Sequence, residues 1–123
     1  MLVVDDEDSL RRALRRLLTG FEVILAADAA QAQAALGSRV FDVVLTDFSM
    51  PGYSGLQLLL DVAGTCPGTR RVLMSGLPAR TFDDHVLSRL VHGVLPKPFD
   101  KASLFRAIGR TPPAPAERRE ATR

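Results

Sequence analysis

At residues 43–55 the chain reads VVLTDFSMPGYSG: an apolar run ends on a carboxylate, and a turn follows at once. A strand that is buried on both faces of a sheet is expected to be apolar along its length, as residues 43–45 are. Pro51 followed by Gly52 is typical of a turn, so the strand should stop soon after Asp47. The stretch therefore predicts a carboxylate at the end of a buried strand, on the rim of a sheet.

Outward from this stretch, apolar runs alternate with segments of helical spacing. The expected strands are Met1–Val4, Phe21–Ala26, Phe41–Thr46, Arg71–Ser75 and Gly93–Pro96. The expected helices run from a cap at Asp8 or Ser9 to a stop at Gly20, from Asp28 to Leu36, from about Ser54 to Ala63, from Phe82 to Leu90, and onward from a cap at Asp100. Strand and helix therefore alternate from one end of the chain to the other.

Parallel strands need crossover connections, and right-handed crossovers place helices on both faces of the sheet. The predicted fold class is α/β: a doubly wound, five-stranded parallel sheet of flavodoxin-like order 2-1-3-4-5, with five helices on both faces. Pro96 cannot donate a ladder hydrogen bond, which favours an edge position for the fifth strand. We expect residues 1–110 to form this domain, and Thr111–Arg123, rich in Pro, Ala, Arg and Glu, to form a disordered tail.

Composition narrows the range of partners. The 123 residues carry a formal net charge of only +2, which gives no long-range attraction toward nucleic acid or a membrane surface. The sequence contains no apolar run of about 18 residues that could span a membrane, and Asp5 and Asp6 interrupt any signal peptide. The single cysteine, Cys66, fits a reducing compartment. We therefore expect a cytoplasmic protein with no nucleic-acid or membrane partner.

Four of the five expected strands deliver polar side chains to the same rim. Asp5 and Asp6 follow the first strand, Asp47 follows the third, Ser75 ends the fourth and Lys97 follows the fifth. Ligands of open α/β sheets bind at the carboxyl ends of the strands, where the strand order reverses. Each residue alone has an ordinary explanation in turn or helix-terminus chemistry. Their convergence on one rim indicates a functional site.

Three clustered carboxylates repel one another and favour a bound cation. Because all of the donors are hard oxygen atoms, Mg²⁺ is the expected metal, with Mn²⁺ as a substitute. Asp47 can then act as a nucleophile toward a phosphoryl group and form an aspartyl-phosphate. Lys97 and the metal would neutralise charge on the transferred group, and the Ser75 hydroxyl would bind one of its oxygens.

In these residues the sequence resembles the response-regulator receiver domains of two-component signalling. The resemblance covers residues 1–110, and the motifs occur in family-like order: Val3-Val4-Asp5-Asp6-Glu7, Leu45-Thr46-Asp47, Met50-Pro51-Gly52, Ser54-Gly55, Met74-Ser75-Gly76 and Lys97-Pro98-Phe99. It implies that Asp47 is the phosphoacceptor and that a histidine kinase or histidine phosphotransfer protein supplies the phosphoryl group. The changed surface would then act on a downstream protein.

The resemblance also implies a role for each residue at the rim. Asp6 would bind the metal directly and Asp5 would act through a bound water. Asp47 and the Ser49 backbone carbonyl would complete the protein's share of the metal shell. Ser75 corresponds to the family's switch hydroxyl and Lys97 to its lysine, with a cis bond between Lys97 and Pro98.

One position departs from the family pattern. Val94 stands three residues before Lys97, where an aromatic switch residue is usual. The usual inward swing of a ring therefore cannot operate. We expect Val94, Leu95 and Phe99 to repack on this face instead.

The first helix carries four arginines: Arg11, Arg12, Arg15 and Arg16. Charged helix faces are common, so a solvated basic face is one explanation. The other is a docking face for an acidic phosphodonor module, because the family's kinase-docking surface includes this helix.

Two other classes of protein use related chemistry. A metal-dependent phosphatase or phosphotransferase with an Asp nucleophile usually has a second acid two residues later, where this chain has Ser49. A nucleotide or flavin binder needs a Gly-rich or hydroxyl-rich phosphate loop after the first strand, and the acidic run Asp5–Asp8 would repel phosphate without a metal. We therefore expect a receiver that catalyses its own phosphorylation and slow hydrolysis, not an enzyme with a separate substrate. It would be a single-domain regulator or part of a larger protein such as a hybrid histidine kinase.

Overall fold

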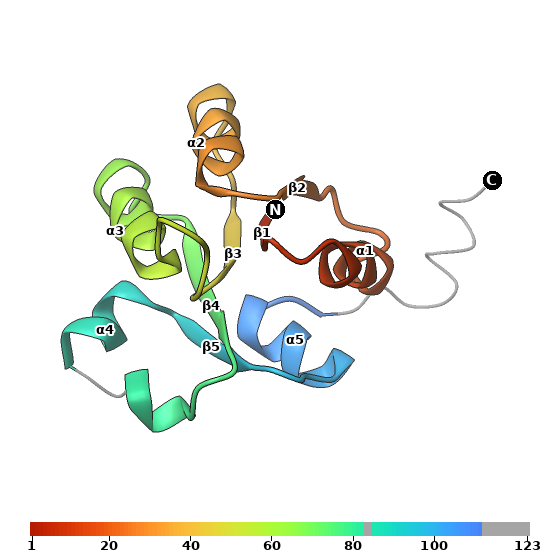
Figure 1. Ribbon diagram of the computed structural model, residues 1–123. Helices are drawn as coiled ribbons and strands as arrows, with labels where there is room; N and C mark the ends of the chain where they lie inside the picture. Colours follow the sequence, from red (N-terminus) through yellow and green to blue (C-terminus); the bar gives the residue numbers. More distant parts are fainter. Residues whose placement is uncertain (83–84, 112–123) are drawn as a thin grey trace.

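The computed structural model describes residues 1–82 and 85–111, in which strands and helices alternate (Figure 1). The strands are β1 (Leu2–Val4), β2 (Ile24–Ala26), β3 (Val43–Asp47), β4 (Arg70–Ser75) and β5 (Gly93–Pro96). The α-helices are α1 (Asp8–Leu17), α2 (Ala29–Ser38), α3 (Gly55–Thr65), α4 (His85–Leu90) and α5 (Lys101–Ile108). A short 3₁₀-helix, η1 (Ala79–Phe82), precedes α4.

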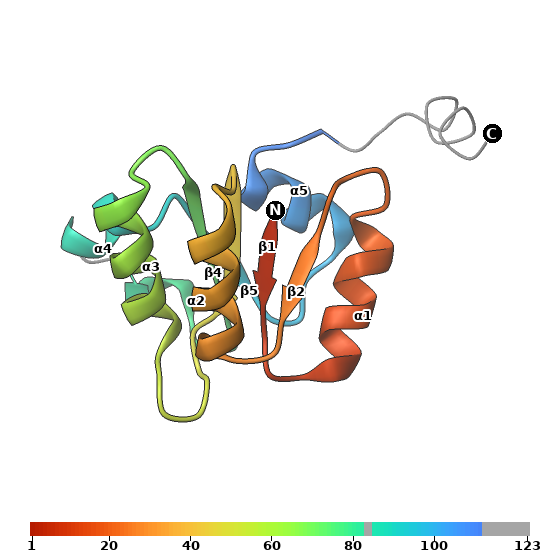
Figure 2. The same ribbon diagram turned by 90° about the horizontal axis from the view of Figure 1, so that it is seen from above.

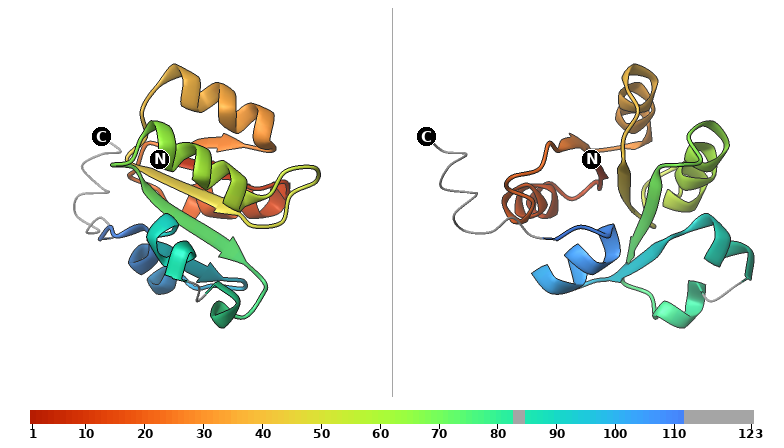
Figure 3. Two further views of the ribbon diagram at one scale, coloured as in Figure 1. Left: turned by 90° about the vertical axis from the view of Figure 1, so that its left-hand side faces the viewer. Right: turned by 180° about the vertical axis from the view of Figure 1, so that it is seen from behind.

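The five strands form one parallel sheet in the order β2-β1-β3-β4-β5. This confirms the predicted doubly wound topology. Helices α1 and α5 cover one face of the sheet, and α2, α3 and α4 cover the other (Figures 1 and 3). Strand β5 lies at an edge, and its last residue, Pro96, is exposed, as expected from its missing donor.

Two apolar cores hold the layers together, one on each face of the sheet. Successive strand side chains point to opposite faces, so each buried strand contributes to both cores. On the α2–α3 face, the fully buried residues include Leu2, Val44, Leu58, Leu59 and Leu73. On the α1–α5 face, they include Val3, Leu14, Leu45, Leu104 and Ile108. A sheet covered on both faces is a rigid support for side chains at its rim.

The strand register brings the carboxyl ends of the central strands together. Val4 pairs with Thr46, and Asp47 pairs with Met74. The residues that follow β1 therefore lie beside the end of β3. Figure 2 shows the β1–α1 and β3–α3 connections leaving the sheet at this same end.

Side-chain caps fix the beginnings of three helices. The carboxylate of Asp28 accepts a hydrogen bond from the Gln31 backbone N–H, and that of Asp100 accepts one from Ser103, both at 2.8 Å. The Ser54 hydroxyl accepts from Gln57 at the start of α3. These three starts were predicted from the sequence.

Some helix boundaries differ from the predicted ones: α1 ends at Leu17, before Gly20, and α2 and α3 end at Ser38 and Thr65, two residues past their expected ends. In the helix expected over Phe82–Leu90, α4 covers His85–Leu90, residues 83 and 84 lie outside the described residues, and Phe82 instead ends the preceding 3₁₀-helix. That turn is closed by a hydrogen bond from the Thr81 N–H to the Pro78 carbonyl, the i to i+3 pattern of a 3₁₀ turn. Of the expected tail, residues 112–123 lie outside the described residues.

Gly55, the first residue of α3, lies against the end of β3. Its N–H donates to the Phe48 carbonyl at 2.9 Å. A Cβ atom at this position would lie 2.0 Å from the Asp47 backbone oxygen and 2.9 Å from its carbonyl carbon. Only glycine allows α3 to begin this close to the strand end that carries Asp47.

We predict that Gly55→Ala destabilises the domain, because the added methyl group must displace backbone atoms of Asp47. Overpacking of this kind costs about 1–3 kcal/mol or more in free energy of unfolding. The matched control is Gly64→Ala in the same helix, where an added Cβ has nothing within 4 Å. That change should stabilise the helix by up to about 1 kcal/mol. Urea unfolding of both variants checks this, and equal effects would contradict it.

Candidate functional site

Three carboxylates converge at the rim where β1 and β3 end. Asp5 and Asp6 follow β1, Asp47 ends β3, and one oxygen of each lies within 4.8 Å of the other two. Asp5 and Asp47 are buried, whereas Asp6 is exposed. Like charges this close together repel strongly in a partly buried site. The cluster therefore needs positive charge beside it.

Lys97 supplies positive charge to this cluster from the end of β5. Its Nζ lies 2.9 Å from Asp5 Oδ2 and 3.2 Å from Asp47 Oδ1. Its backbone N–H donates to the Ser75 carbonyl at 2.8 Å, which holds it to the end of β4. The Lys97–Pro98 peptide bond is cis, as the family resemblance implied. Lys97, which follows β5, thus makes contacts with residues at the carboxyl ends of β1, β3 and β4.

Both the backbone and the side chain of Asp5 make hydrogen bonds to neighbouring residues. Its N–H donates to the Ala26 carbonyl on β2, and its own carbonyl accepts from Arg11 Nη1. Oδ1 accepts the Glu7 N–H at 2.8 Å, and Oδ2 accepts from Lys97. These contacts leave Asp6 as the exposed carboxylate of the cluster, the one most open to an arriving ion.

The local electrostatics perturb both Asp47 and Lys97. Burial raises the pKa of Asp47 above its ordinary value, and the neighbouring Asp5 carboxylate raises it further, while Lys97 opposes the rise. Desolvation alone would lower the pKa of Lys97, but its hydrogen bond to Asp5 and the two carboxylate charges outweigh this and raise it. Lys97 therefore stays protonated at neutral pH.

Ser75 and Asp47 line the same cavity. Its volume is about 290 Å³, and its other lining residues are Phe48, Ser49, Gly76 and Leu77. The buried Ser75 hydroxyl accepts the Leu77 N–H at 3.0 Å. A serine hydroxyl has one proton and two acceptor sites, so this bond leaves its proton for an anionic group in the cavity.

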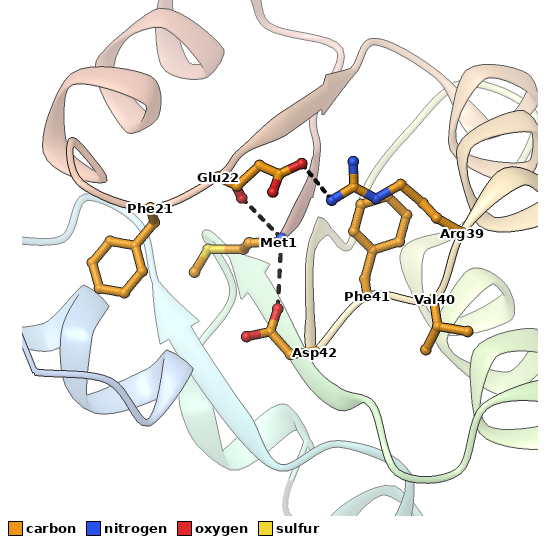
Figure 4. Close-up of a pocket in the computed structure, with 7 residues that line it drawn as sticks. All are labelled: Met1, Phe21, Glu22, Arg39, Val40, Phe41 and Asp42. Carbon is orange, nitrogen blue, oxygen red and sulfur yellow. Dashed lines mark hydrogen bonds and ion pairs between the residues drawn. The ribbon is translucent and has the colours of Figure 1, made fainter.

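A second pocket lies at the opposite, amino-terminal ends of the strands (Figure 4). Arg39 and Glu22 form an ion pair of 2.6 Å across it, and the Arg39 guanidinium lies 5.0 Å from the centre of the Phe41 ring. The polar side chains of this pocket thus already have partners: Glu22 and Arg39 pair with each other, and Asp42 pairs with Arg110. The rim that carries Asp47 is the stronger candidate for the functional site.

The donor set at that rim fits a hard divalent cation. Mg²⁺ is held in proteins by one or two carboxylates, with water or phosphate oxygens completing its shell. Asp5, Asp6 and Asp47 offer three carboxylates in one cluster, and one of them is exposed. The structure thus brings together Asp5, Asp6, Asp47, Ser75 and Lys97, and it places Ser49 beside Asp47 in the cavity wall.

Comparison with known proteins gives the family. The sequence pattern of the response regulator receiver domain matches residues 1–109. This chain belongs to the response regulator receiver domain family. The receiver is 33% identical to protein PetR of Rhodobacter capsulatus, over 88% of this chain and 46% of PetR. It is 31% identical to the transcriptional regulator NtrC of a Bradyrhizobium strain, over 96% of this chain and 25% of that protein.

Other relatives and solved structures agree. The receiver is 33% identical to the sensor kinase CckA of Brucella abortus, over 88% of this chain and 12% of CckA. A receiver domain from Clostridium thermocellum superposes with a TM-score of 0.79, at 26% identity, over 88% of this chain and 89% of that one. TrrA of Thermotoga maritima, solved with Mg²⁺ and BeF, superposes with a TM-score of 0.78 at 26% identity, over 88% of this chain and 94% of that one. The receiver spans less than half the length of these three curated relatives.

The structure corrects the expectation for Val94. Val94 packs into the core on the α2–α3 face, whereas Leu95 and Phe99 lie in the core on the opposite face. The three side chains therefore cannot repack together. In the Val94 core, a phenylalanine from another element contributes an aromatic ring: Phe82 of η1 meets Phe48 edge to face, with ring centres 5.2 Å apart.

The four arginines of α1 differ in their exposure to solvent. Arg12, Arg15 and Arg16 are exposed, as either explanation of the basic face requires. The Arg11 side chain is only 15% exposed and is bonded within the domain. Sequence spacing gave no sign of this difference.

We predict that Asp47→Asn stabilises the metal-free receiver near neutral pH. The pKa of Asp47 is higher in the folded state than its ordinary value of 3.8, so the folded domain holds that proton more tightly. Stability is therefore lost as the pH rises from 3.8 through the raised pKa. Asn removes this loss, so its melting temperature in EDTA should exceed that of the wild type at neutral pH, and the difference should shrink in acid.

The control is Asp42→Asn. The hydrogen bond from Arg110, 2.7 Å long, lowers the pKa of Asp42, so this carboxylate stabilises the fold above its ordinary pKa. Its removal should lower the melting temperature slightly, because the pair is exposed. A lower melting temperature for Asp47→Asn at neutral pH would contradict the prediction.

Proposed function

We propose that this receiver accepts a phosphoryl group on Asp47 from a phosphohistidine of a histidine kinase or histidine phosphotransfer protein. One observation carries the proposal: Asp47 ends the central strand β3 inside a carboxylate cluster, within 3.2 Å of Lys97. In the same place it lines a cavity with Ser75. A nucleophile and a hydroxyl donor thus line one cavity large enough for a small anion, and the Lys97 ammonium contacts the nucleophile.

Each residue has one part in the transfer. A carboxylate oxygen of Asp47 attacks phosphorus, the bond to the donor imidazole nitrogen breaks, and that nitrogen keeps the electron pair. Lys97 stays charged and balances the negative charge on the phosphoryl oxygens. The Ser75 hydroxyl donates to one of these oxygens. Since phosphoryl transfer depends mainly on positioning and charge balance, these groups account for most of what the protein must provide.

In this proposal Asp5, Asp6, Asp47 and the Ser49 backbone carbonyl hold Mg²⁺, with Mn²⁺ as a substitute. The support is the hard-oxygen character of the donors and the closeness of the three carboxylates, whose oxygens lie within 4.8 Å of one another. Asp6, as the exposed member, binds directly, and Asp5, already bonded to Lys97 and the Glu7 N–H, acts through water. When bound, the ion neutralises phosphoryl oxygens during transfer.

A phosphatase with an Asp nucleophile is not favoured. Receivers are signal-receiving domains, and Ser49 stands where such an enzyme needs its second acid. We infer self-catalysed phosphorylation and slow hydrolysis of the aspartyl-phosphate. The altered surface then contacts a downstream protein, not nucleic acid. Within the described ranges, no helix is long and apolar enough to cross a membrane; we propose that the receiver acts in the cytoplasm.

Incubation with acetyl phosphate and Mg²⁺, followed by intact mass measurement, tests the proposal. We expect the wild type to gain one phosphoryl group, and Asp47→Asn or added EDTA to abolish the gain. Asp61→Asn, a change at an exposed carboxylate of α3 that accepts a hydrogen bond from the Tyr53 hydroxyl and lies outside the carboxylate cluster, is the control and should still be phosphorylated. If neither acetyl phosphate nor a phosphorylated histidine protein modifies the wild type, the proposal is wrong.

A further inference from the structure

Arg11 lies beside the carboxylate cluster and is held differently from the other arginines of α1. Its guanidinium makes a fork: Nη1 donates to the backbone carbonyl of Asp5 at 2.5 Å, and Nη2 bonds to Asp8 Oδ1 at 3.1 Å. Arg11 is 15% exposed, whereas Arg12, the next residue, is 67% exposed. The fork therefore joins the end of β1 to the first turn of α1.

The segment that the fork spans contains Asp6. Asp5 is fixed by the sheet and by Lys97, but Asp6 is exposed and follows the strand end. The N-cap of α1, Glu7, makes no side-chain capping bond to the residues that the structure describes, in contrast to the caps Asp28, Ser54 and Asp100 of the other helices. The start of α1 is thus tied to the end of β1 by the Arg11 side chain, together with the Glu7 N–H that donates to Asp5 Oδ1, whereas α2, α3 and α5 use a side-chain cap.

We propose that Arg11 is a positioning residue for the metal site: by holding the β1–α1 turn, it fixes Asp6 relative to Asp5 and Asp47. This inference rests on the proposed function, because it concerns the same metal-assisted site. It also removes Arg11 from the basic face that a phosphodonor could contact and leaves Arg12, Arg15 and Arg16 for that surface. The role is exerted through a backbone carbonyl, so Arg11 touches neither the metal nor the phosphoryl group.

The charge of Arg11 and its proposed positioning role predict opposite changes in Mg²⁺ affinity when Arg11 is replaced. A positive charge beside a cation site weakens cation binding, so electrostatics alone predicts tighter Mg²⁺ binding in Arg11→Gln. Loss of the fork predicts weaker binding, because groups that orient metal ligands are typically worth about 10- to 100-fold in affinity. Arg11→Lys keeps the charge but cannot form a planar fork to two acceptors. It therefore tests position without a change of charge.

The experiment measures the Mg²⁺ dissociation constant of the full chain by calorimetry, for the wild type, Arg11→Gln, Arg11→Lys and the control Arg15→Lys. We expect a weakening of about 10-fold in Arg11→Gln, a smaller weakening in Arg11→Lys, and no change in Arg15→Lys. Circular dichroism of each variant checks that it is folded. Unchanged or tighter binding in Arg11→Gln would overturn the inference, and so would equal weakening in Arg15→Lys.

Phosphorylation by acetyl phosphate separates this role from a docking role. The Mg²⁺ concentration for half-maximal rate should rise in both Arg11 variants, while the rate at saturating Mg²⁺ stays within about twofold of the wild type, because affinity and not chemistry has changed. A defect seen only with a protein phosphodonor would overturn the inference in favour of docking. If the wild type binds Mg²⁺ but is not phosphorylated by any donor, the proposed function fails, and the calorimetric comparison still decides the role of Arg11.

Discussion

The structure of this receiver depends on one electrostatic constraint: three carboxylates must share the rim of a buried parallel sheet. Asp5, Asp6 and Asp47 have oxygens within 4.8 Å of one another, and such a cluster is unfavourable without neighbouring positive charge. The fold places Lys97 between Asp5 and Asp47, from a strand two positions away from β3 in the sheet. The site is therefore assembled by long-range contacts across the sheet, and its geometry holds only while the sheet is intact.

Much of this arrangement could be predicted from the sequence, for identifiable reasons. The apolar run of β3 and the turn after it fix Asp47 at a strand end, and alternation with helices fixes a parallel order. Once the order is known, the other rim residues follow, because all parallel strands deliver their carboxyl ends to the same edge. The cis Lys97–Pro98 bond was foreseen from family resemblance and not from the residues themselves.

The features that sequence reasoning missed are those set by tertiary contact. Phe82 was assigned to the helix by local pattern, but it ends the 3₁₀-helix η1, and its ring packs against Phe48. Arg11 has the same helical spacing as its exposed neighbours, and its distinct role comes from the proximity of the Asp5 carbonyl. The joint repacking of Val94 and Leu95 could have been excluded earlier, since adjacent residues of a strand face opposite sides of a sheet.

Lys97 is a cation that cannot diffuse away from the site. Because its ammonium already contacts Asp5 and Asp47, an arriving metal ion or phosphoryl group enters a site whose charge is partly balanced. A cation that binds here replaces contacts that Lys97 already makes with the carboxylates. The free energy of binding is therefore the difference between the new contacts and the ones they replace. Such a difference is smaller than the gain at a carboxylate cluster without a neighbouring cation, so we expect the fixed ammonium of Lys97 to weaken cation binding at this rim.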